Sequence, residues 1–317
     1  LGVYYTDIVK EIGGFRVGLE GAQDYDLALR FTEKINPDQI FHIPRILYHW
    51  RIHPQSTADV SANAKPYAMR NGEHALNEHL QRVGIKACAK LVGHGYRVHY
   101  ELPSPIPLAT LLILTRDKCD FLERCIESIL KKTEYSSYEI LVVDNGSREH
   151  ETLDYFAHLQ RRHVAKVIRD DGDFNFSRLN NLGVRSAKGE ILVLMNNDLE
   201  VIDEYWLAEM VSLAIQPMTG AVGAKLLYPN GRIQHGGVIL GIGGWAGHAH
   251  KGFPERSLGY AGRLSLVSEF SAVTGACLAL RKELYAKVGG LDEVELPVAC
   301  NDVDLCLRLR QNIKHIS

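Results

Sequence analysis

From residue 108 onward, short apolar runs alternate with segments in which apolar residues recur at helical spacing. The clearest run, Ile191 to Met195, is too short to span a membrane and dense enough to be a strand buried on both faces. Strands that alternate with helices predict a mostly parallel sheet flanked by helices, an α/β fold. We predict strands over residues 108–114, 140–143, 164–168, 191–195 and 221–227, and helices around residues 122–130, 176–187 and 203–215. Ser177 can cap the second of these helices.

The first hundred residues follow a different pattern. Residues 67–83 have apolar positions at helical spacing, and residues 91–102 look extended. Residues 40–50 suggest one or two short strands, broken at Pro44. We therefore expect one helix and a few strands before the alternating region begins.

Two stretches interrupt these patterns. Pro103, Pro105 and Pro107 form a stiff connector, and we place a domain boundary there. Between Pro229 and Gly262 the alternation lapses into a glycine-rich region. A long irregular stretch in a compact domain is usually functional, so we expect this region to contribute to a site.

Polar side chains directly follow three of the predicted strands. They are Thr115, Arg116 and Asp117; Asp144 and Asn145; and Asn196, Asn197 and Asp198. Open α/β sheets bind ligands at the carboxyl ends of their strands, and a hard cation beside phosphates prefers carboxylate oxygens. We expect the clusters to converge on one nucleotide, with Asp144 accepting from base or ribose and Asp198 holding a metal on the diphosphate. Alternatively, each cluster is only a turn with a helix cap.

A fourth polar cluster, Asn301 to Asp304, begins a predicted helix whose buried face contains Leu305, Leu309 and Ile313. The positive end of the helix dipole would keep the Asp302 carboxylate ionised. An ionised carboxylate within reach of a hydroxyl can act as a general base. The alternative is that Asp302 or Asn301 only caps the helix, and the sequence does not separate the two roles.

A pattern near the start of the chain recurs near its end. Ile12-Gly-Gly-Phe15 and Gln23-Asp-Tyr-Asp-Leu-Ala-Leu-Arg30 match Val288-Gly-Gly-Leu291 and Asn301-Asp-Val-Asp-Leu-Cys-Leu-Arg308. Agreement at this many positions predicts two homologous units in tandem. We expect this chain to be a fragment that begins near the end of the first unit and stops before the end of the second.

The composition disfavours some classes of protein. A net charge of -2 over 317 residues gives no electrostatic reason to expect nucleic acid as a partner. The six cysteines contain no CxxC pair, which predicts reduced cysteines rather than a metal site or a disulfide framework. No apolar run reaches the length of a membrane helix, and the first residues are not a signal peptide.

Two motifs in the glycine-rich region are weaker than they look. Gly241 to Ala246 fits the loose dinucleotide pattern G-x-G-x-x-A, but the residues that follow cannot start the required helix, so we reject it. His235, His248 and His250 could form a metal site, yet histidines near glycines more often serve loop structure or substrate contacts.

Taken together, the motifs resemble glycosyltransferase family 2, the inverting enzymes of GT-A fold, and in particular the bacterial tandem-domain members that build surface polysaccharide. The matching segments are ILTRD at 113–117, VVDNGS at 142–147, FNFSRLNNLG at 174–183, LMNNDLE at 194–200, HGG at 235–237, VTGACLALR at 273–281 and NDVDLCLRLR at 301–310. The resemblance implies a GT-A fold over residues 107–317, a linker over 61–106, and the C-terminal part of a preceding glycosyltransferase-like unit over 1–60.

The resemblance also implies roles for individual residues. Asp302 would be the catalytic base that deprotonates the acceptor hydroxyl, and Asp198 and Asn196 would bind Mg²⁺ or Mn²⁺. Asn196 stands where the family motif has Asp, and Asn301 stands where it usually has Glu. Seven residues would bind the nucleotide-sugar: Thr115, Arg116, Asp144, Asn145, Asn175, Asn180 and Asn197. Thr274, Gly275 and Asn301 would line the acceptor pocket.

The implied activity is transfer of a sugar, with inversion, from a nucleotide-diphosphate sugar to a hydroxyl of a glycan or lipid-linked acceptor. We expect a cytoplasmic protein, with peripheral association at the inner face of the membrane left open, and a swap-like oligomer in which the first unit docks onto another copy. Two other classes of protein are alternatives. A nucleotidyltransferase would need a glycine-rich loop after the first strand, and residues 115–118 contain no glycine. The other is a non-catalytic nucleotide- or glycan-binding module of a multidomain glycosyltransferase.

Overall fold

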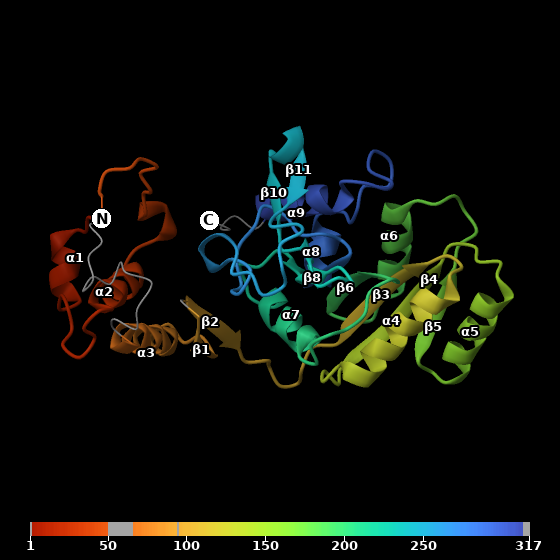
Figure 1. The fold of residues 1–317 in the computed structure, drawn as a ribbon, viewed down its shortest axis with the longest axis horizontal. Helices are drawn as coiled ribbons and strands as arrows, with labels where there is room; N and C mark the ends of the chain where they lie inside the picture. Colours follow the sequence, from red (N-terminus) through yellow and green to blue (C-terminus); the bar gives the residue numbers. More distant parts are fainter. Residues whose placement is uncertain (1, 50–65, 94, 313–317) are drawn as a thin grey trace. The chain divides into compact units, whose positions relative to one another are not determined.

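The computed structural model describes residues 2–49, 66–93 and 95–312, and these fall into two compact units (Figure 1). Unit 1 extends to Glu101 and also includes Ser265–Val267, whereas unit 2 contains the other described residues from Leu102 onward. Within the described ranges, no helix is long and apolar enough to cross a membrane.

Unit 1 is built from short helices and one hairpin. Its elements are α1 (Thr6–Glu11), α2 (Gln23–Thr32), the 3₁₀ turn η1 (Pro37–Gln39), α3 (Pro66–Arg82), β1 (Ala87–Val92) and β2 (Gly95–Tyr100). The helix predicted over 67–83 is confirmed. The stretch predicted as extended over 91–102 contains the last two residues of β1 and all of β2, which form an antiparallel pair.

The strands predicted over residues 40–50 are wrong where the structure describes them. Residues 40–49 contain no strand, and Trp50 lies outside the described residues. Ile40, Phe41 and Ile46 are exposed there. A strand needs a partner for its backbone groups, and apolar content alone does not supply one.

A six-stranded sheet forms the centre of unit 2. Its strands are β3 (Ala109–Thr115), β4 (Tyr138–Asp144), β5 (Ala165–Arg169), β6 (Ile191–Asn196), β7 (Val222–Gly223) and β12 (Cys277–Arg281), in the order β5-β4-β3-β6-β12-β7. The first four, β3 to β6, are parallel to one another, whereas β12 runs antiparallel to both β6 and β7. The predicted α/β fold with a mostly parallel sheet is confirmed.

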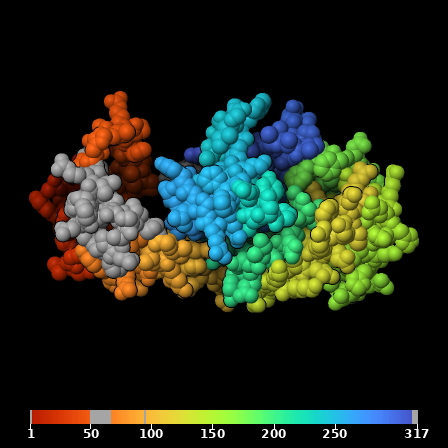
Figure 2. All heavy atoms as spheres, in the orientation of Figure 1, coloured from red at the N-terminus to blue at the C-terminus, as the bar shows by residue number. Residues whose placement is uncertain are grey.

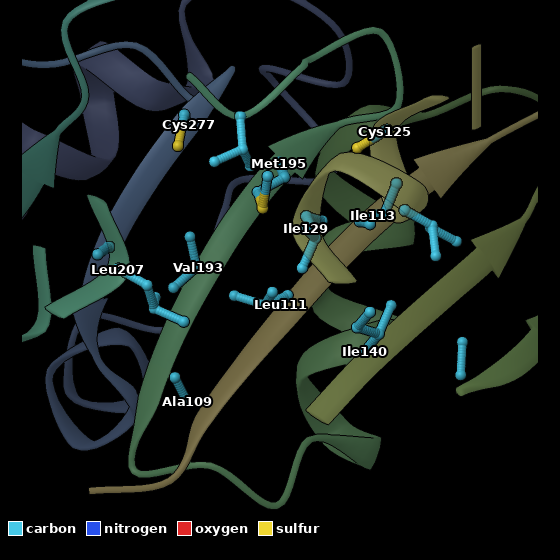
Figure 3. Close-up of a cluster of buried hydrophobic side chains, with 14 of the residues drawn as sticks. Ala109, Leu111, Ile113, Cys125, Ile129, Ile140, Val193, Met195, Leu207 and Cys277 are labelled. Atoms are coloured by element: carbon cyan, nitrogen blue, oxygen red, sulfur yellow. The ribbon is translucent and has the colours of Figure 1, made fainter. Parts of the chain in front are cut away.

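Helices cover both faces of this sheet because successive strand residues point to opposite sides. Leu111 and Val193 pack under α4 (Cys119–Lys132), α5 (His150–Arg161) and α7 (Trp206–Ala214). Leu112 and Leu192 pack on the other face, under α6 (Phe176–Ser186), α8 (Lys282–Lys287) and α9 (Asn301–Asn312). Figure 3 shows the first of these two cores, with strand residues Ala109, Leu111, Ile113, Val193 and Met195 beside Cys125 and Ile129 of α4.

Two details of unit 2 correct the sequence predictions. The N-cap of α6 is Asn175, whose side-chain oxygen accepts from Arg178 N at 2.9 Å, and not Ser177. The single strand predicted over 221–227 is divided into β7 and β8 (Leu226–Leu227), because β8 leaves the sheet to pair with β9 (Ile233–His235). The local pattern of apolar residues does not show that a strand changes its pairing partner in this way.

The glycine-rich region contains small hairpins instead of large elements. After β9 the chain forms β10 (Val238–Leu240), the 3₁₀ turn η2 (Ile242–Gly244), β11 (Ala246–His248) and a second 3₁₀ turn, η3 (Tyr260–Gly262). The β10–β11 hairpin projects from the surface of unit 2, drawn in cyan (Figure 2), and Trp245 beside its turn is exposed. A 3₁₀ turn and a strand follow Gly241, so rejecting the dinucleotide motif there is confirmed.

Candidate active site

The register of the parallel strands places the predicted polar clusters at one edge of the sheet. Thr115, the last residue of β3, is paired with Asp144, the last residue of β4. On its other side, Leu114 is paired with Asn196, the last residue of β6. The carboxyl ends of three neighbouring strands therefore lie side by side, as an α/β ligand site requires.

Asp144 and Asn145 are buried and hold the shape of this edge. Asp144 Oδ1 accepts from Ser147 N and Oδ2 from Arg169 Nη1, both at 2.9 Å. The Asn145 amide donates to the carbonyl of Gly172 at 2.8 Å, whereas its Oδ1 is buried and has no hydrogen-bond partner among the residues that the structure describes. A buried acceptor without a partner is costly, and a donor from a bound molecule would satisfy it.

The end of β6 presents the free oxygens of the site. The Asp198 carboxylate is exposed, and no residue in the described ranges donates a hydrogen bond to it. Asn196 is half-buried and its side-chain amide is likewise free of hydrogen bonds to described residues. Asn197 instead donates from Nδ2 to Thr115 Oγ1 at 3.0 Å, which ties the end of β6 to the end of β3.

The loop after β3 is fixed by backbone hydrogen bonds to one carboxylate. Asp117 Oδ1 accepts from Arg148 N at 2.7 Å and from Glu149 N at 2.9 Å. These two N–H groups hold the pKa of the Asp117 carboxyl below its usual range. Arg116, which lies between Thr115 and Asp117, is exposed and carries a charge that suits phosphate.

Three predicted site residues make their contacts within the protein. Asn175 caps α6 and also donates to the carbonyl of Glu293 at 2.9 Å. Asn180 is buried and donates to the carbonyl of Phe176 one turn earlier. Asn301 is buried, with its amide 3.2 Å from Ser177 Oγ. Their assignment to donor or acceptor binding stays a prediction, and the contacts seen are structural.

Residues 274–276, just before β12, join the β6 end to α9. The N–H of Asn196 donates to the Ala276 carbonyl at 3.0 Å. The N–H of the next residue back, Gly275, donates to Asp302 Oδ2 at 2.8 Å. The predicted metal-binding end of β6 and the predicted base therefore bond to adjacent residues of one short segment. Thr274, at the start of this segment, is half-buried.

Asp302 is held by two backbone donors. Its Oδ1 accepts from Val303 N at 2.8 Å, inside α9, and its Oδ2 accepts from Gly275 N outside the helix. The carboxylate is half-buried, so solvent still reaches it. The two hydrogen bonds restrict its rotation. The helix itself begins after Cys300, which has φ of 60°. Leu305 and Leu309 are buried as predicted, whereas Ile313 lies outside the described residues.

A pair of histidines stands beside this segment. His235 Nδ1 and His248 Nδ1 are 2.8 Å apart, and Thr274 N and Gly237 N approach His235 Nε2 at 3.4 and 3.3 Å. Because His235 Nε2 accepts, its proton lies on Nδ1, and His248 must then carry its own proton on Nε2. Burial lowers the pKa of His235 to about 4, so this neutral arrangement persists at pH 7.

His248 is the half of the pair on whose pKa the charge of Asp302 acts. Burial and Lys251 lower its pKa, whereas the negative charge of Asp302 acts in the opposite direction. Its Nε2 has no hydrogen-bond partner among described residues and is not enclosed. The sequence allowed a metal site, loop structure or substrate contacts for these histidines, and it did not predict the contact between His235 and His248.

The donor atoms at the end of β6 suit a hard divalent cation. Asp198 supplies one free carboxylate and Asn196 one free amide oxygen, and such ions commonly take one or two carboxylates with the rest from phosphate and water. In the described part of the chain no three His, Cys, Asp or Glu side chains are grouped as a ready-made metal site. His250 is separate from the pair, since its Nε2 accepts from Tyr260 N at 2.9 Å.

Comparison with known proteins agrees with this arrangement. Residues 110–289, more than half of the chain, match the family described as glycosyl transferase family 2. This protein belongs to that family and is a transferase by class. The matched region contains the three strand-end clusters, whereas the fourth cluster, at the start of α9, follows it.

Individual relatives are longer than this chain. It is 48% identical over 98% of its length to the uncharacterized protein y4gI of Sinorhizobium fredii, and covers 34% of that protein. It is 37% identical over 97% of its length to the O-antigen biosynthesis protein RfbC of Myxococcus xanthus, and covers 24% of it. Among solved structures, it resembles a mannosyltransferase from Pyrobaculum calidifontis in complex with GDP-Man and Mn²⁺. The TM-score is 0.46 at 19% identity, over 63% of this chain and 50% of the other.

Proposed function

We propose that unit 2 transfers a sugar, with inversion, from a nucleotide-diphosphate sugar to a hydroxyl of a glycan or lipid-linked acceptor in cell-surface polysaccharide synthesis. The observation that carries this proposal is that the end of β6 and the start of α9 are hydrogen-bonded to two adjacent residues. Asn196 bonds to Ala276 and Asp302 bonds to Gly275. The donor side and the acceptor side of the reaction thus meet at one segment.

On the donor side, the strand ends receive the nucleotide and its diphosphate. The buried, unpaired Asn145 Oδ1 suits a donor from the base or ribose, and Arg116 suits a phosphate. Asp144 and Thr115 hold the edge in shape through their own hydrogen bonds. Asp198 and Asn196 would hold Mg²⁺ or Mn²⁺, which neutralises charge on the leaving diphosphate when bound.

On the acceptor side, Asp302 is the proposed general base. It accepts the proton of the acceptor hydroxyl as that oxygen bonds to the anomeric carbon and the bond to the diphosphate breaks. The N–H groups of Gly275 and Val303 fix the carboxylate in one orientation, so little reorganisation is needed at the moment of transfer. Thr274 and Gly275 would line the acceptor pocket beside it.

The test is a calorimetric titration of the chain with UDP, GDP and dTDP, with and without Mn²⁺. Asp198→Asn removes the charge of the proposed ligand with almost no change in shape. The matched control is Glu190→Gln, an exposed carboxylate directly before β6, about 20 Å along the strand from Asp198.

We expect one nucleotide to bind in a metal-dependent way, with affinity reduced at least about tenfold in Asp198→Asn and unchanged in Glu190→Gln. Metal-dependent binding that both variants retain would remove Asp198 from the site. Binding without any turnover of the matching nucleotide-sugar would favour the alternative, a nucleotide- or glycan-binding module.

The organisation of the whole protein is part of the same proposal. Residues 1–60 belong to the C-terminal part of a preceding glycosyltransferase-like unit, residues 61–106 link it to the next, and residues 107–317 are the GT-A domain. Docking of the first unit onto another copy, location in the cytoplasm and contact with the inner face of the membrane are proposed with it. Light scattering and fractionation of the full-length protein test these points.

A further inference from the structure

The tip of the β10–β11 hairpin in unit 2 carries apolar side chains that stand in solvent. Trp245 is 82% exposed, Ile242 47% and Leu240 40%. The hairpin projects from the surface of unit 2 (Figure 2), so these side chains are gathered at one projecting point. Exposed apolar groups that are gathered in this way mark an interaction site.

The backbone of the tip is fixed although its turn is open to solvent. Gly241 N donates to the Trp245 carbonyl at 2.8 Å, and Trp245 N donates to the Ile242 carbonyl at 3.3 Å. Gly241 and Gly244 have φ of 90° and 85°, which favours glycine, and the space beside both is open. The turn therefore holds Trp245 in a defined position and leaves it exposed.

The chain around the hairpin is basic, although the protein as a whole is not. Residues 225–263 contain a single carboxylate, that of Glu255, whereas the whole chain has a net charge of -2. The Lys and Arg side chains of this stretch are Lys225, Arg232, Lys251, Arg256 and Arg263. Lys251 and Arg256 are exposed and form no hydrogen bond or ion pair with described residues. Their charges are available to anionic groups outside the protein.

These free cations lie near the base of the same two-stranded arm. Gly252 N donates to the Ile233 carbonyl at 2.8 Å, and Arg232 pairs with Pro254, so backbone pairing continues below β10 and β11. Lys251 follows Trp245 by six residues, which span at most about 20 Å. A bilayer with anionic headgroups accepts this order of groups, because apolar side chains enter the interface while cations stay at the phosphates.

The tip is also close to the acceptor side of the proposed site. His248 lies three residues after Trp245, at most about 10 Å along the chain. Its Nδ1 is 2.8 Å from His235 Nδ1, and His235 Nε2 is approached by Thr274 N at 3.4 Å. A surface that binds the tip therefore lies near the segment that holds the proposed base.

We propose that the tip of the β10–β11 hairpin, residues 240–245, inserts into the interface of an anionic lipid bilayer, with Lys251 and Arg256 at the headgroup phosphates. Trp245 is the anchor, because its indole combines a large apolar ring with an N–H that suits the polar headgroup region. The insertion itself does not depend on the function proposed for unit 2. Its consequence for the acceptor rests on that function: a site held at a bilayer favours a lipid-linked acceptor over a free glycan.

The test is sedimentation of the purified chain with vesicles of phosphatidylcholine alone and of phosphatidylcholine mixed with phosphatidylglycerol. Trp245→Ala removes the anchor, Trp245→Phe keeps an aromatic ring, and the double variant Lys251→Gln with Arg256→Gln removes the free cations. Tyr205→Ala is the matched aromatic control, since Tyr205 is 57% exposed before α7. Lys166→Gln is the charge control, on β5 at the edge of the sheet opposite β7. Thermal unfolding checks that each variant is folded.

We expect the wild type to bind the anionic vesicles more tightly than the neutral ones. Trp245→Ala should lower binding to anionic vesicles at least about fivefold. The double variant should lower it about tenfold or more at low salt, where charges are least screened. Trp245→Phe should keep most of the binding and lose the shift of tryptophan emission to shorter wavelength that insertion causes. Both controls should bind as the wild type does.

Two results would overturn the inference: a wild type that binds no vesicles, and a Trp245→Ala variant that binds them equally well. Equal binding of the wild type to neutral and anionic vesicles would overturn the assignment of Lys251 and Arg256. Nucleotide titration of the same samples separates this inference from the function of unit 2. Vesicle binding lost in Trp245→Ala while nucleotide binding is retained supports the inference. A wild type that binds vesicles and no nucleotide supports it too, and contradicts only the function proposed for unit 2.

Discussion

The backbone N–H of Gly275 donates a hydrogen bond to Asp302 Oδ2 at 2.8 Å, and so fixes the carboxylate of α9 to the segment that leads into β12. The bond crosses between elements that are separated along the chain. Asp302 therefore does not act only as a helix cap, because its Oδ2 accepts a hydrogen bond from Gly275, a residue outside the helix.

Asp302→Asn should abolish most of the transfer while sparing the fold and the donor site. The amide oxygen of Asn can still accept from Gly275 N, but an amide cannot take the proton of the acceptor. We expect turnover to fall by about 10²- to 10⁴-fold, with nucleotide affinity unchanged. Release of nucleoside diphosphate and calorimetry measure the two quantities on the same sample. Equal turnover in Asp302→Asn and Glu190→Gln would show that another group is the base.

His248 should position the acceptor through its Nε2–H. His248→Leu removes this donor, and we expect the acceptor KM to rise by about three- to tenfold with a smaller change in kcat, as fits loss of one neutral hydrogen bond. His248→Gln places an N–H donor at a similar distance and should restore most of the affinity. His250→Gln is the matched control, since His250 bonds to Tyr260 and not to the pair.

A second measurement tests the tautomers directly. Nitrogen NMR of the imidazole rings at pH 7 should show the proton of His235 on Nδ1 and that of His248 on Nε2. The opposite pattern would mean that His248 offers an acceptor to the site, and a role in donating to the substrate would then be wrong.

The stability of unit 2 should fall on mild acidification because of His235. Its pKa is lowered from 6.5 to about 4 by burial, so the unfolded chain binds a proton at higher pH than the folded one. The stabilisation is fully present above about pH 6.5 and is lost as the pH falls towards 4, by on the order of 1–3 kcal/mol. Thermal unfolding between pH 7 and 4.5 measures this slope. It should be smaller in His235→Asn and unchanged in His42→Gln, which alters an exposed histidine.

Gly183 should be indispensable to the packing of α6 on the sheet. A Cβ at this position would overlap Leu112 of β3 and come within 3.0 Å of Val143 of β4. We expect Gly183→Ala to lower the free energy of unfolding by about 1–3 kcal/mol, because both neighbours are buried. Chemical denaturation measures the change, with Ser186→Ala in the same helix as control. A stability difference below about 0.5 kcal/mol would show that α6 can shift.

Much of the sheet could be predicted because it depends on local pattern. The run from Ile191 to Met195 is buried as expected, and the clusters at Thr115, Asp144 and Asn196 meet because parallel register brings strand ends together. The hydrophobic pattern that indicates a buried strand or a helix lies within each segment, so it can be recognised in the sequence alone.

What could not be predicted depends on which partner a segment finds. Leu226 and Leu227 look like a continuation of β7 but pair with β9, and Asn175 competes successfully with Ser177 as the cap of α6. The contact between His235 and His248 needs a hairpin whose register is set by the turn between β10 and β11. Each outcome is decided by tertiary contacts that no short window of sequence includes.

The antiparallel direction of β12 has a consequence for how specificity can change. Because β12 starts at the edge where β3, β4 and β6 end, the chain enters that edge from the glycine-rich region instead of leaving it. We therefore expect insertions or deletions in the glycine-rich region, residues 229–262, to change the surface that leads into this edge without changing the register of β3, β4 and β6.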